Sequence, residues 1–320
     1  MKVILSISGG GIKGLIPAMI LAEIENRTGK KISECCNLIA GNSTGGLIAC
    51  LLTTPNDDGI PKYSTSKIVN MYKQFGKRVF SRNVLRKVLT LDGLTWNKYS
   101  CKPLEKLLKD YFGENKLDDV TTDILIPTYQ ISNTPYPNFF KSTYAKNPTS
   151  PDENPYLWEC ARATSAASSY FRPYKYDKNL TFIDGGLFAN NPAVCAYAEG
   201  KKMWGENEQI VLISLGTCED LKGYEYNDIK NWGRVQWAVP YFEQTSISAD
   251  ATVDYMLRTF ANAHSDDIYY HLQAELDEHS LEMDDASDKN IARLESFAKL
   301  FIEKNTTRID EICRILKNVK

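Results

Sequence analysis

A serine flanked by glycines carries the clearest chemical signal in this sequence. The pentapeptide Gly41-Asn42-Ser43-Thr44-Gly45 follows the apolar run Leu38 to Ala40 and precedes the apolar run Gly46 to Leu52. The first run predicts a buried strand and the second a helix, so Ser43 is expected on a tight strand-to-helix turn. Such a turn exposes a hydroxyl at the positive end of a helix, and the two glycines let backbone segments pass closely. Ser43 is therefore a candidate nucleophile.

A glycine-rich loop stands ahead of this serine. The loop is Gly9-Gly10-Gly11-Ile12-Lys13-Gly14, between a strand-like run and a helix-like run. It satisfies the G-x-G-x-x-G dinucleotide fingerprint, but the second strand ends without the carboxylate that would hold a ribose. A Walker P-loop is excluded because that motif needs Ser or Thr directly after its lysine, whereas Gly14 follows Lys13 here. Adjacent glycines at a helix start can still present backbone N–H groups to developing negative charge, which is the role of an oxyanion hole.

Two kinds of base are available to Ser43. The histidines, His264, His271 and His279, are spaced by seven and eight residues on an acidic stretch. This spacing predicts one solvated helix face rather than catalysis or a zinc site. The order Ser, acid, His of α/β-hydrolases is formally present, but in that fold the nucleophile follows several strands rather than the second. Alternatively, an apolar strand delivers Asp184 into the pair Gly185-Gly186, where partial desolvation would raise its pKa and make it a base.

The strand-like and helix-like runs predict one α/β domain over residues 1–320. Its 43% hydrophobic content suffices for a full core. A helical basic insertion is expected at about 53–117, an irregular surface loop at 133–155 and a helical C-terminal part at about 247–320. Strands that alternate with helices predict a mostly parallel sheet covered on both faces. We place them at Lys2–Ser8, Leu38–Ala40, Ile124–Ile131, Leu180–Ile183 and Gln209–Leu215.

Composition and charge restrict the partners and the compartment. The formal net charge of −2 gives no pull toward nucleic acid, and the eight cysteines lack C-x-x-C spacing, which favours a reduced, cytoplasmic protein. Too few residues precede the glycine loop for a signal-peptide core, and no apolar stretch is long enough to span a bilayer. Any membrane contact is therefore expected to be peripheral.

Charge is unevenly distributed along the chain. Residues 59–91 hold eight basic and no acidic side chains, whereas residues 259–288 hold nine acidic and no basic ones. One interpretation is a pair of solvated helix faces that partly neutralise each other. The other is a basic surface, interleaved with apolar residues, that settles on anionic lipid. The second interpretation makes four residues membrane-contact candidates: Lys77, Arg78, Arg82 and Arg86.

Three blocks together resemble the patatin-like phospholipases: the Gly9–Gly14 loop, the Ser43 pentapeptide and Asp184-Gly185-Gly186. The likeness continues through 161–167, 190–192 and Asp284-Asp285-Ala286-Ser287, although Ser8 and Ser168 stand where the family usually has Asp and Pro. The resemblance implies a patatin-like three-layer α/β/α fold with a Ser nucleophile elbow and a histidine-free Ser43–Asp184 dyad. The implied oxyanion hole is the backbone of Gly10, Gly11 and Ile12. The implied supporting residues are Gly9, Lys13, Gly14, Gly41, Gly45, Gly185 and Gly186.

The same resemblance implies a lipid acyl hydrolase of phospholipase A type. Such an enzyme releases ester-linked fatty acids from membrane phospholipids through an acyl-enzyme, with no metal or cofactor. It would be cytoplasmic and peripheral at the inner membrane face when active. Compact bacterial relatives include antiphage effectors switched on by a nucleotide, so the resemblance permits a small nucleotide activator. Two alternatives stay open: a catalytically idle lipid-binding or scaffold protein, and an acyltransferase with an acceptor other than water. Head group, sn-position and oligomeric state are not predicted.

Overall fold

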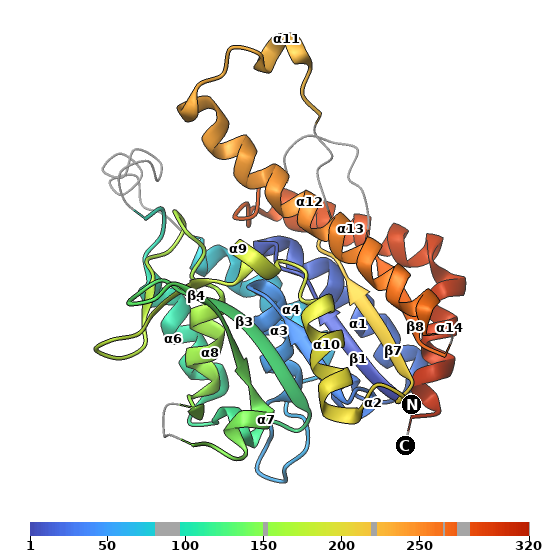
Figure 1. Cartoon of the computed structure of the whole chain (residues 1–320). Coiled ribbons are helices and arrows are strands. Elements are labelled where there is room, and N and C mark those ends of the chain that lie inside the picture. The colour runs from blue at the N-terminus through green and yellow to red at the C-terminus, as the bar shows by residue number, and fades with distance from the viewer. Residues whose placement is uncertain (81–96, 150–152, 219–222, 265, 274–281, 320) are drawn as a thin grey trace.

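The structure is a computed structural model that describes residues 1–80, 97–149, 153–218, 223–264, 266–273 and 282–319 (Figure 1). Within these residues an eight-stranded sheet has the order β5-β6-β3-β2-β1-β7-β8, and β4 pairs with β3 outside this path. The strands are β1 (Lys2–Ile7), β2 (Leu38–Gly41), β3 (Asp123–Gln130), β4 (Tyr136–Lys141), β5 (Tyr174–Lys175), β6 (Thr181–Asp184), β7 (Ile210–Leu215) and β8 (Ile268–Leu272). Strands β3, β2, β1, β7 and β8 run parallel, whereas β4 and β6 run antiparallel to β3.

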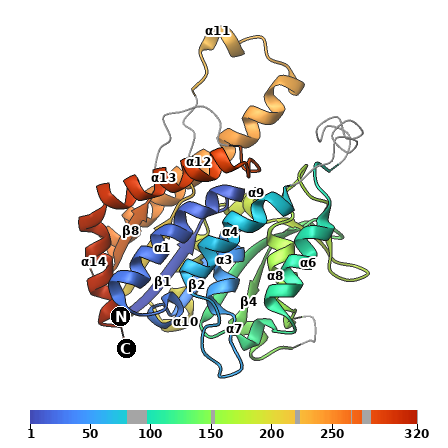
Figure 2. The same cartoon turned by 180° about the vertical axis from the view of Figure 1, so that it is seen from behind.

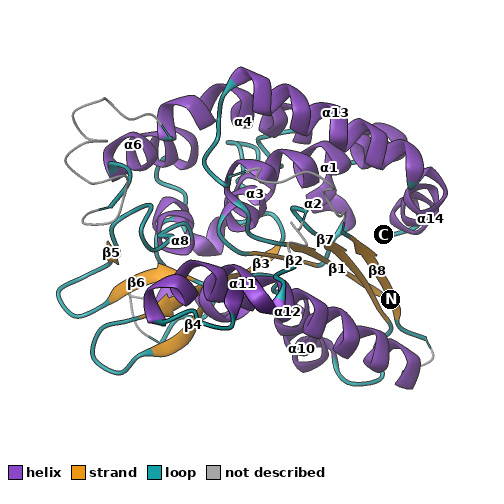
Figure 3. Ribbon diagram, turned by 90° about the horizontal axis from the view of Figure 1, so that it is seen from above, coloured by secondary structure: helices purple, strands orange, loops and turns teal. Residues whose placement is uncertain are grey.

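Helices cover both faces of this sheet (Figures 2 and 3). One face carries α1 (Leu15–Thr28), α3 (Thr44–Thr53), α4 (Thr65–Val79), α6 (Cys101–Phe112), α8 (Leu157–Thr164), α13 (Asp288–Lys304) and α14 (Thr306–Lys317). The other carries α10 (Ala193–Trp204) and α12 (Arg234–Ala263). Short helices complete the described chain: η1 (Gly11–Gly14), α2 (Ile32–Cys35), η3 (Leu117–Asp119), α7 (Ser142–Ala145), α9 (Gly186–Ala189) and α11 (Tyr226–Ile229).

The central strands are apolar along their whole length because both of their faces are covered. In β1, Val3, Leu5 and Ile7 belong to the core beneath α1 and α3, whereas Ile4 packs toward α10. Each of these four side chains is at most 2% exposed. Strands buried on both faces are typical of parallel sheets between helix layers. The predicted three-layer α/β/α fold is confirmed.

All five predicted strands are present, but the irregular loop predicted at 133–155 is wrong. That segment contains β4, which forms an antiparallel pairing with β3 through Phe140 and Ile126. Two prolines, Pro135 and Pro137, and partly exposed side chains conceal this strand in the sequence. Proline is tolerated there because an edge strand needs only one of its hydrogen-bonding sides.

The prediction that three histidines share a solvated helix face is also wrong. His264 follows the last residue of α12 as its C-cap, and His271 lies in β8 with its side chain only 10% exposed. His279 lies outside the described residues. The chain changes from helix to strand between His264 and His271, so helical spacing does not apply to them.

His271 joins β8 to α12 through two carboxylates. Its Nδ1 lies 2.9 Å from Asp254 Oδ1, and its Nε2 lies 3.5 Å from Asp250 Oδ2. Burial alone would lower the pKa of His271, but the two carboxylates outweigh burial and raise that pKa above its ordinary value. Arg258 also pairs with Asp254, and the Tyr269 ring stacks on the imidazole. Protonated His271 therefore stabilises the attachment of α12 to the sheet edge.

We expect the free energy of unfolding to fall as pH rises through the folded-state pKa of His271. Because folding raises this pKa, the stabilisation is complete below the unfolded-state value and is lost above the folded-state value. Urea unfolding of the wild type and of His271→Gln between about pH 6 and 9 measures the effect. The wild type should lose more stability than His271→Gln, with His264→Gln as the exposed control. Equal pH dependence in wild type and His271→Gln would contradict this role.

Candidate active site

Ser43 occupies the turn between β2 and α3 in a conformation that few non-glycine residues adopt. Its φ is 51° and its ψ is −119°. The Ser43 N–H donates to Thr164 Oγ1 at 2.9 Å, which helps to hold the turn. A Cβ on Gly41 would lie 2.2 Å from the Gly45 carbonyl oxygen, and one on Gly45 would lie 2.1 Å from the Ile7 carbonyl oxygen. Both glycines are therefore required for α3 to start this close to β1 and β2.

Asp184 ends β6 beside this turn. Its Oδ1 accepts hydrogen bonds from Asn42 Nδ2 at 3.1 Å and from the Gly186 N–H at 2.7 Å. The Ser43 side chain lies close enough to this carboxylate to lower its pKa. Burial raises the pKa of Asp184 above its ordinary value, and the nearby Ser43 side chain and the donors Gly186 and Asn42 offset only part of that rise. A carboxylate with a raised pKa is a stronger base, so the pair is arranged for proton transfer.

The glycine loop runs beside the Ser43 turn at the carboxyl end of β1. A Cβ on Gly9 would lie 3.1 Å from the Ser43 Cβ, and one on Gly10 would lie 2.2 Å from Thr217 Oγ1. One on Gly14 would lie 2.4 Å from Thr44 Oγ1. Contacts this short leave no space for a side chain at these three positions. The loop can therefore approach the serine only because it is made of glycine.

The N–H groups of the loop differ in what they bind. Within the described residues, those of Gly10 and Gly11 make no hydrogen bond, whereas the Ile12 N–H donates to the Met283 carbonyl oxygen at 2.8 Å. The Ile12 N–H therefore has a partner in this conformation, and its role as a third oxyanion donor stays a prediction. Gly10 and Gly11 keep available N–H groups, as an oxyanion site requires.

The remaining loop residues attach the loop to its surroundings. Lys13 Nζ donates to the Cys218 carbonyl oxygen at 3.3 Å, and Thr217 Oγ1 donates to the Gly9 carbonyl oxygen at 2.6 Å. The hydroxyl of Ser8 is buried and makes no hydrogen bond within the described residues. The Ser8 backbone N–H donates to the Leu215 carbonyl oxygen at 3.0 Å. The loop is thus held without a carboxylate at position 8.

Sequence reasoning missed the polar side chains that hold the site. Asn42 bridges to Asp184, and Thr164 Oγ1 donates to the Pro127 carbonyl oxygen at 2.7 Å while it accepts from Ser43. The absence of a side chain at Gly185 lets the backbone after Asp184 lie close to Pro127, since a Cβ on Gly185 would be 2.6 Å from the same Pro127 oxygen. Asn42 and Thr164 both stand inside motif blocks, which was the available signal. The residues that the structure describes contain no group of three His, Cys, Asp or Glu side chains that could hold a metal ion.

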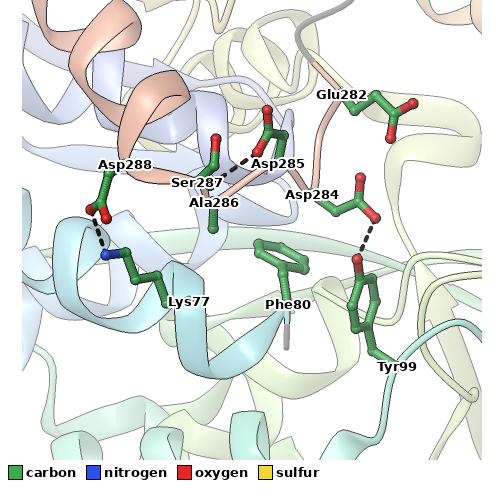
Figure 4. Close-up of a pocket in the computed structure, with 9 residues that line it drawn as sticks. All are labelled: Lys77, Phe80, Tyr99, Glu282, Asp284, Asp285, Ala286, Ser287 and Asp288. Carbon is green, nitrogen blue, oxygen red and sulfur yellow. Dashed lines mark hydrogen bonds and ion pairs between the residues drawn. The ribbon is translucent and has the colours of Figure 1, made fainter. Parts of the chain in front are cut away.

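Two of the four membrane-contact candidates, Lys77 and Arg78, lie in the described part of the chain. Arg82 and Arg86 lie outside the described residues. Lys77, on α4, pairs with Asp288 at the start of α13 (Figure 4), and Arg78 is its neighbour on α4. The Lys77–Asp288 pair agrees with the interpretation in which the basic and acidic stretches meet and partly neutralise each other.

Comparison with known proteins identifies the family of this chain. The family model described as patatin-like phospholipase matches residues 5–197, which include the Ser43 turn, the glycine loop and Asp184. The chain belongs to the patatin-like phospholipase family. Patatin-like protein 4 of Arabidopsis thaliana is 31% identical over 96% of this chain and 84% of its own length. Patatin-like protein 2 of Oryza sativa is 29% identical over 97% of this chain and 86% of its own length.

Family membership supports lipid acyl hydrolase activity in general. It does not by itself show catalysis, because one relative, from Solanum tuberosum, carries the name "Probable inactive patatin-3-Kuras 1"; it is 28% identical over 96% of this chain and 88% of its own length. Among solved structures, VipD from Legionella pneumophila has a TM-score of 0.39 and 12% identity over 94% of this chain and 67% of its own. That similarity is too low to bear on function. None of the described helices combines the length and apolarity needed to cross a membrane.

We expect Gly10→Ala to lower kcat on a soluble p-nitrophenyl ester by about a hundredfold or more, because one oxyanion donor is typically worth about 3 kcal/mol. The added methyl group would collide with Thr217 and shift the loop. The control is Gly29→Asn at the end of α1, where φ is 71° and nothing lies within 4 Å. Asparagine tolerates that conformation, so the control should keep its kcat. Unchanged turnover in Gly10→Ala would remove the loop from catalysis.

Proposed function

We propose that this protein is a lipid acyl hydrolase in which Ser43 attacks an ester carbonyl and Asp184 is its general base. The observation that carries the proposal is the hydrogen bond from Asn42, in the same strained strand-to-helix turn as Ser43, to Asp184 Oδ1, which places the carboxylate beside the serine. A serine becomes nucleophilic when a base lies within hydrogen-bond reach and other groups orient that base. Asn42 and Gly186 orient Asp184 in this way.

The reaction follows from these positions. Asp184 accepts the Ser43 proton as Oγ forms a bond to the ester carbonyl carbon. The N–H groups of Gly10 and Gly11 stabilise the negative charge that develops on the carbonyl oxygen. The ester C–O bond of the tetrahedral intermediate then breaks, Asp184 gives its proton to the leaving alkoxide, and the alcohol departs with the acyl group left on Ser43 Oγ. Ionised again, Asp184 takes a proton from the water that attacks the acyl carbon, and it returns this proton to Ser43 Oγ as the acyl C–O bond breaks and the fatty acid leaves.

The family supports a phospholipid ester as the substrate class. On this proposal the protein acts in the cytoplasm, bound peripherally to the inner membrane face. The basic residues of 59–91 support docking on anionic lipid, since each basic residue near such a surface contributes about 1 kcal/mol. The proposal also includes a small nucleotide activator and a role in antiphage defence, and these two rest on the family resemblance alone.

A catalytically idle lipid-binding protein is the second candidate, because one relative is named as inactive. Acyl transfer to an acceptor other than water is a third, since it shares the acyl-enzyme. Mass spectrometry of mixed phospholipid vesicles after incubation separates the three. Free fatty acid identifies a hydrolase, an acylated acceptor identifies a transferase, and the absence of any new product identifies an idle protein.

Ser43→Ala and Asp184→Asn should each lower esterase activity by several orders of magnitude, because each removes a group that acts in the bond-making step. The double variant should be no slower than the slower single variant, since the two groups act as a unit. In the wild type, kcat/KM should fall as pH falls through the raised pKa of Asp184, because only the ionised carboxylate accepts the Ser43 proton. Steady-state kinetics across pH measures all three effects.

The controls for the dyad are Ser66→Ala and Asp57→Asn, at two exposed positions away from the site. Asp184→Asn should melt no lower than wild type at neutral pH, because a carboxylate whose pKa folding raises costs stability when it is ionised. The dyad assignment is wrong if Asp184→Asn retains wild-type kcat, or if His271→Gln abolishes activity with the fold intact.

Removal of charge at Lys77, Arg78, Arg82 and Arg86, each to Gln, should reduce hydrolysis of anionic vesicles while it spares a small soluble ester. Added salt should mimic the variant in the wild type, because screening shortens the range of the attraction. Replacement of four exposed lysines of α13 and α14 by Gln is the matched control: Lys289, Lys299, Lys304 and Lys317. Equal losses in both quadruple variants would mean that the basic segment has no special role at the membrane.

A further inference from the structure

A short C-terminal segment lies directly against the glycine loop. We call Glu282–Ser287 the strap; it precedes α13 and lies next to the C-terminal end of α4 (Figure 4). The Met283 carbonyl oxygen accepts the Ile12 N–H at 2.8 Å. A Cβ on Gly11 would lie 2.1 Å from that same oxygen, and Gly11 has a φ of 60°. The strap is therefore in backbone contact with the loop that carries the proposed oxyanion donors.

The residue after Met283 fixes the strap to the body of the protein. Asp284 is 6% exposed, and its Oδ2 accepts the Tyr99 hydroxyl at 2.5 Å (Figure 4). The same oxygen lies 2.6 Å from Lys98 Nζ, whose side chain is 15% exposed. Charge-assisted hydrogen bonds of this kind are among the strongest that side chains make. The two partners therefore fix the position of Asp284 and with it the neighbouring carbonyl of Met283.

Lys98 and Tyr99 are themselves attached near the dyad. The Lys98 backbone N–H donates to the Ser169 carbonyl oxygen, and that of Tyr99 donates to the Tyr170 carbonyl oxygen, each at 2.8 Å. Both acceptors lie in the segment that follows α8. A few residues earlier in that segment, the Ala166 carbonyl oxygen accepts the Asp184 N–H at 3.1 Å. The segment that binds the Asp184 backbone and the glycine loop are thus linked through Asp284.

The strap also encloses the side chain of Ile12. This side chain is 1% exposed, and a Cβ on Gly76 of α4 would lie 2.6 Å from its Cδ1 and 3.0 Å from the Ala286 Cβ. Ile12 is therefore enclosed between α4 and the strap, and its backbone N–H points to Met283. Displacement of Met283 would leave that buried N–H without its partner, which costs free energy and favours a rearranged loop.

We propose that Asp284 is a positioning residue for the oxyanion hole, acting through Met283 and Ile12. This inference rests on the proposed function of Ser43 and the loop. The Met283 carbonyl occupies the Ile12 N–H, and that bond fixes the loop with the N–H groups of Gly10 and Gly11 left available to the substrate. Asp284 does not touch the substrate; it holds the strap where this bond can form.

The test compares Asp284→Asn with Asp288→Asn, a second strap-proximal carboxylate that pairs with Lys77 instead. On a soluble p-nitrophenyl ester, Asp284→Asn should lower kcat about tenfold to a hundredfold, less than the complete loss of an oxyanion donor, with little change in KM. Asp288→Asn should keep its kcat. Tyr99→Phe removes one hydrogen bond from the same carboxylate and should give a smaller loss. The Asp284→Asn, Tyr99→Phe double variant should show less than the sum of the two effects in free energy.

Two further readouts distinguish positioning from general destabilisation. The pH at which kcat/KM falls should stay at its wild-type value in Asp284→Asn, because the environment of Asp184 is unchanged. The kcat loss should persist well below the melting temperature of each variant. The inference is overturned if Asp284→Asn and Tyr99→Phe keep wild-type kcat when folded, or if their losses appear in KM alone. Ser43→Ala distinguishes failure of the proposed function from failure of this inference. If Ser43→Ala stays active, the proposed function is wrong. If Ser43→Ala is inactive and Asp284→Asn keeps wild-type kcat, only the role of Asp284 is wrong.

Discussion

The turn that carries Ser43 is the constraint on which the rest of the site depends. A non-glycine residue at a φ of 51° costs of order 1–3 kcal/mol and persists only where its surroundings fix it. Here α3 begins against β1 and β2 with backbone approaches that only Gly41 and Gly45 permit. The packing of α3 thus holds the strain, and the strained turn presents the hydroxyl at the carboxyl end of the central strand β2. The other site residues are placed relative to that hydroxyl.

The basicity proposed for Asp184 depends on a balance between burial and hydrogen bonding. Burial raises its pKa, and the donors Asn42 and Gly186, together with Ser43, oppose the rise. Stronger donation would make the carboxylate too weak a base, and deeper burial would keep it protonated. Asn42 belongs to the same turn as Ser43, so one short segment supplies both the nucleophile and a group that adjusts its base.

The sequence predicts the parts of this structure that depend on local pattern. The central strands are recognisable because burial on both faces demands continuous apolar runs, and the Ser43 turn because its packing demands glycine on both sides. Strand β4 escaped prediction because an edge strand tolerates proline and polar residues. The bond between Ile12 and Met283 could not be foreseen, since any residue can offer a backbone carbonyl. The same limit applies to His271, whose partners lie on a neighbouring helix rather than at helical spacing.

The central claim is that Ser43 is the nucleophile and that Asp184 activates it. Incubation with a fluorophosphonate, followed by peptide mapping by mass spectrometry, tests this claim most directly, because the reagent bonds covalently to an activated serine. The account predicts one adduct, on the peptide that contains Ser43, formed far more slowly in Asp184→Asn and absent in Ser43→Ala. An adduct on another residue, or labelling of Ser43 at the wild-type rate in Asp184→Asn, would contradict it.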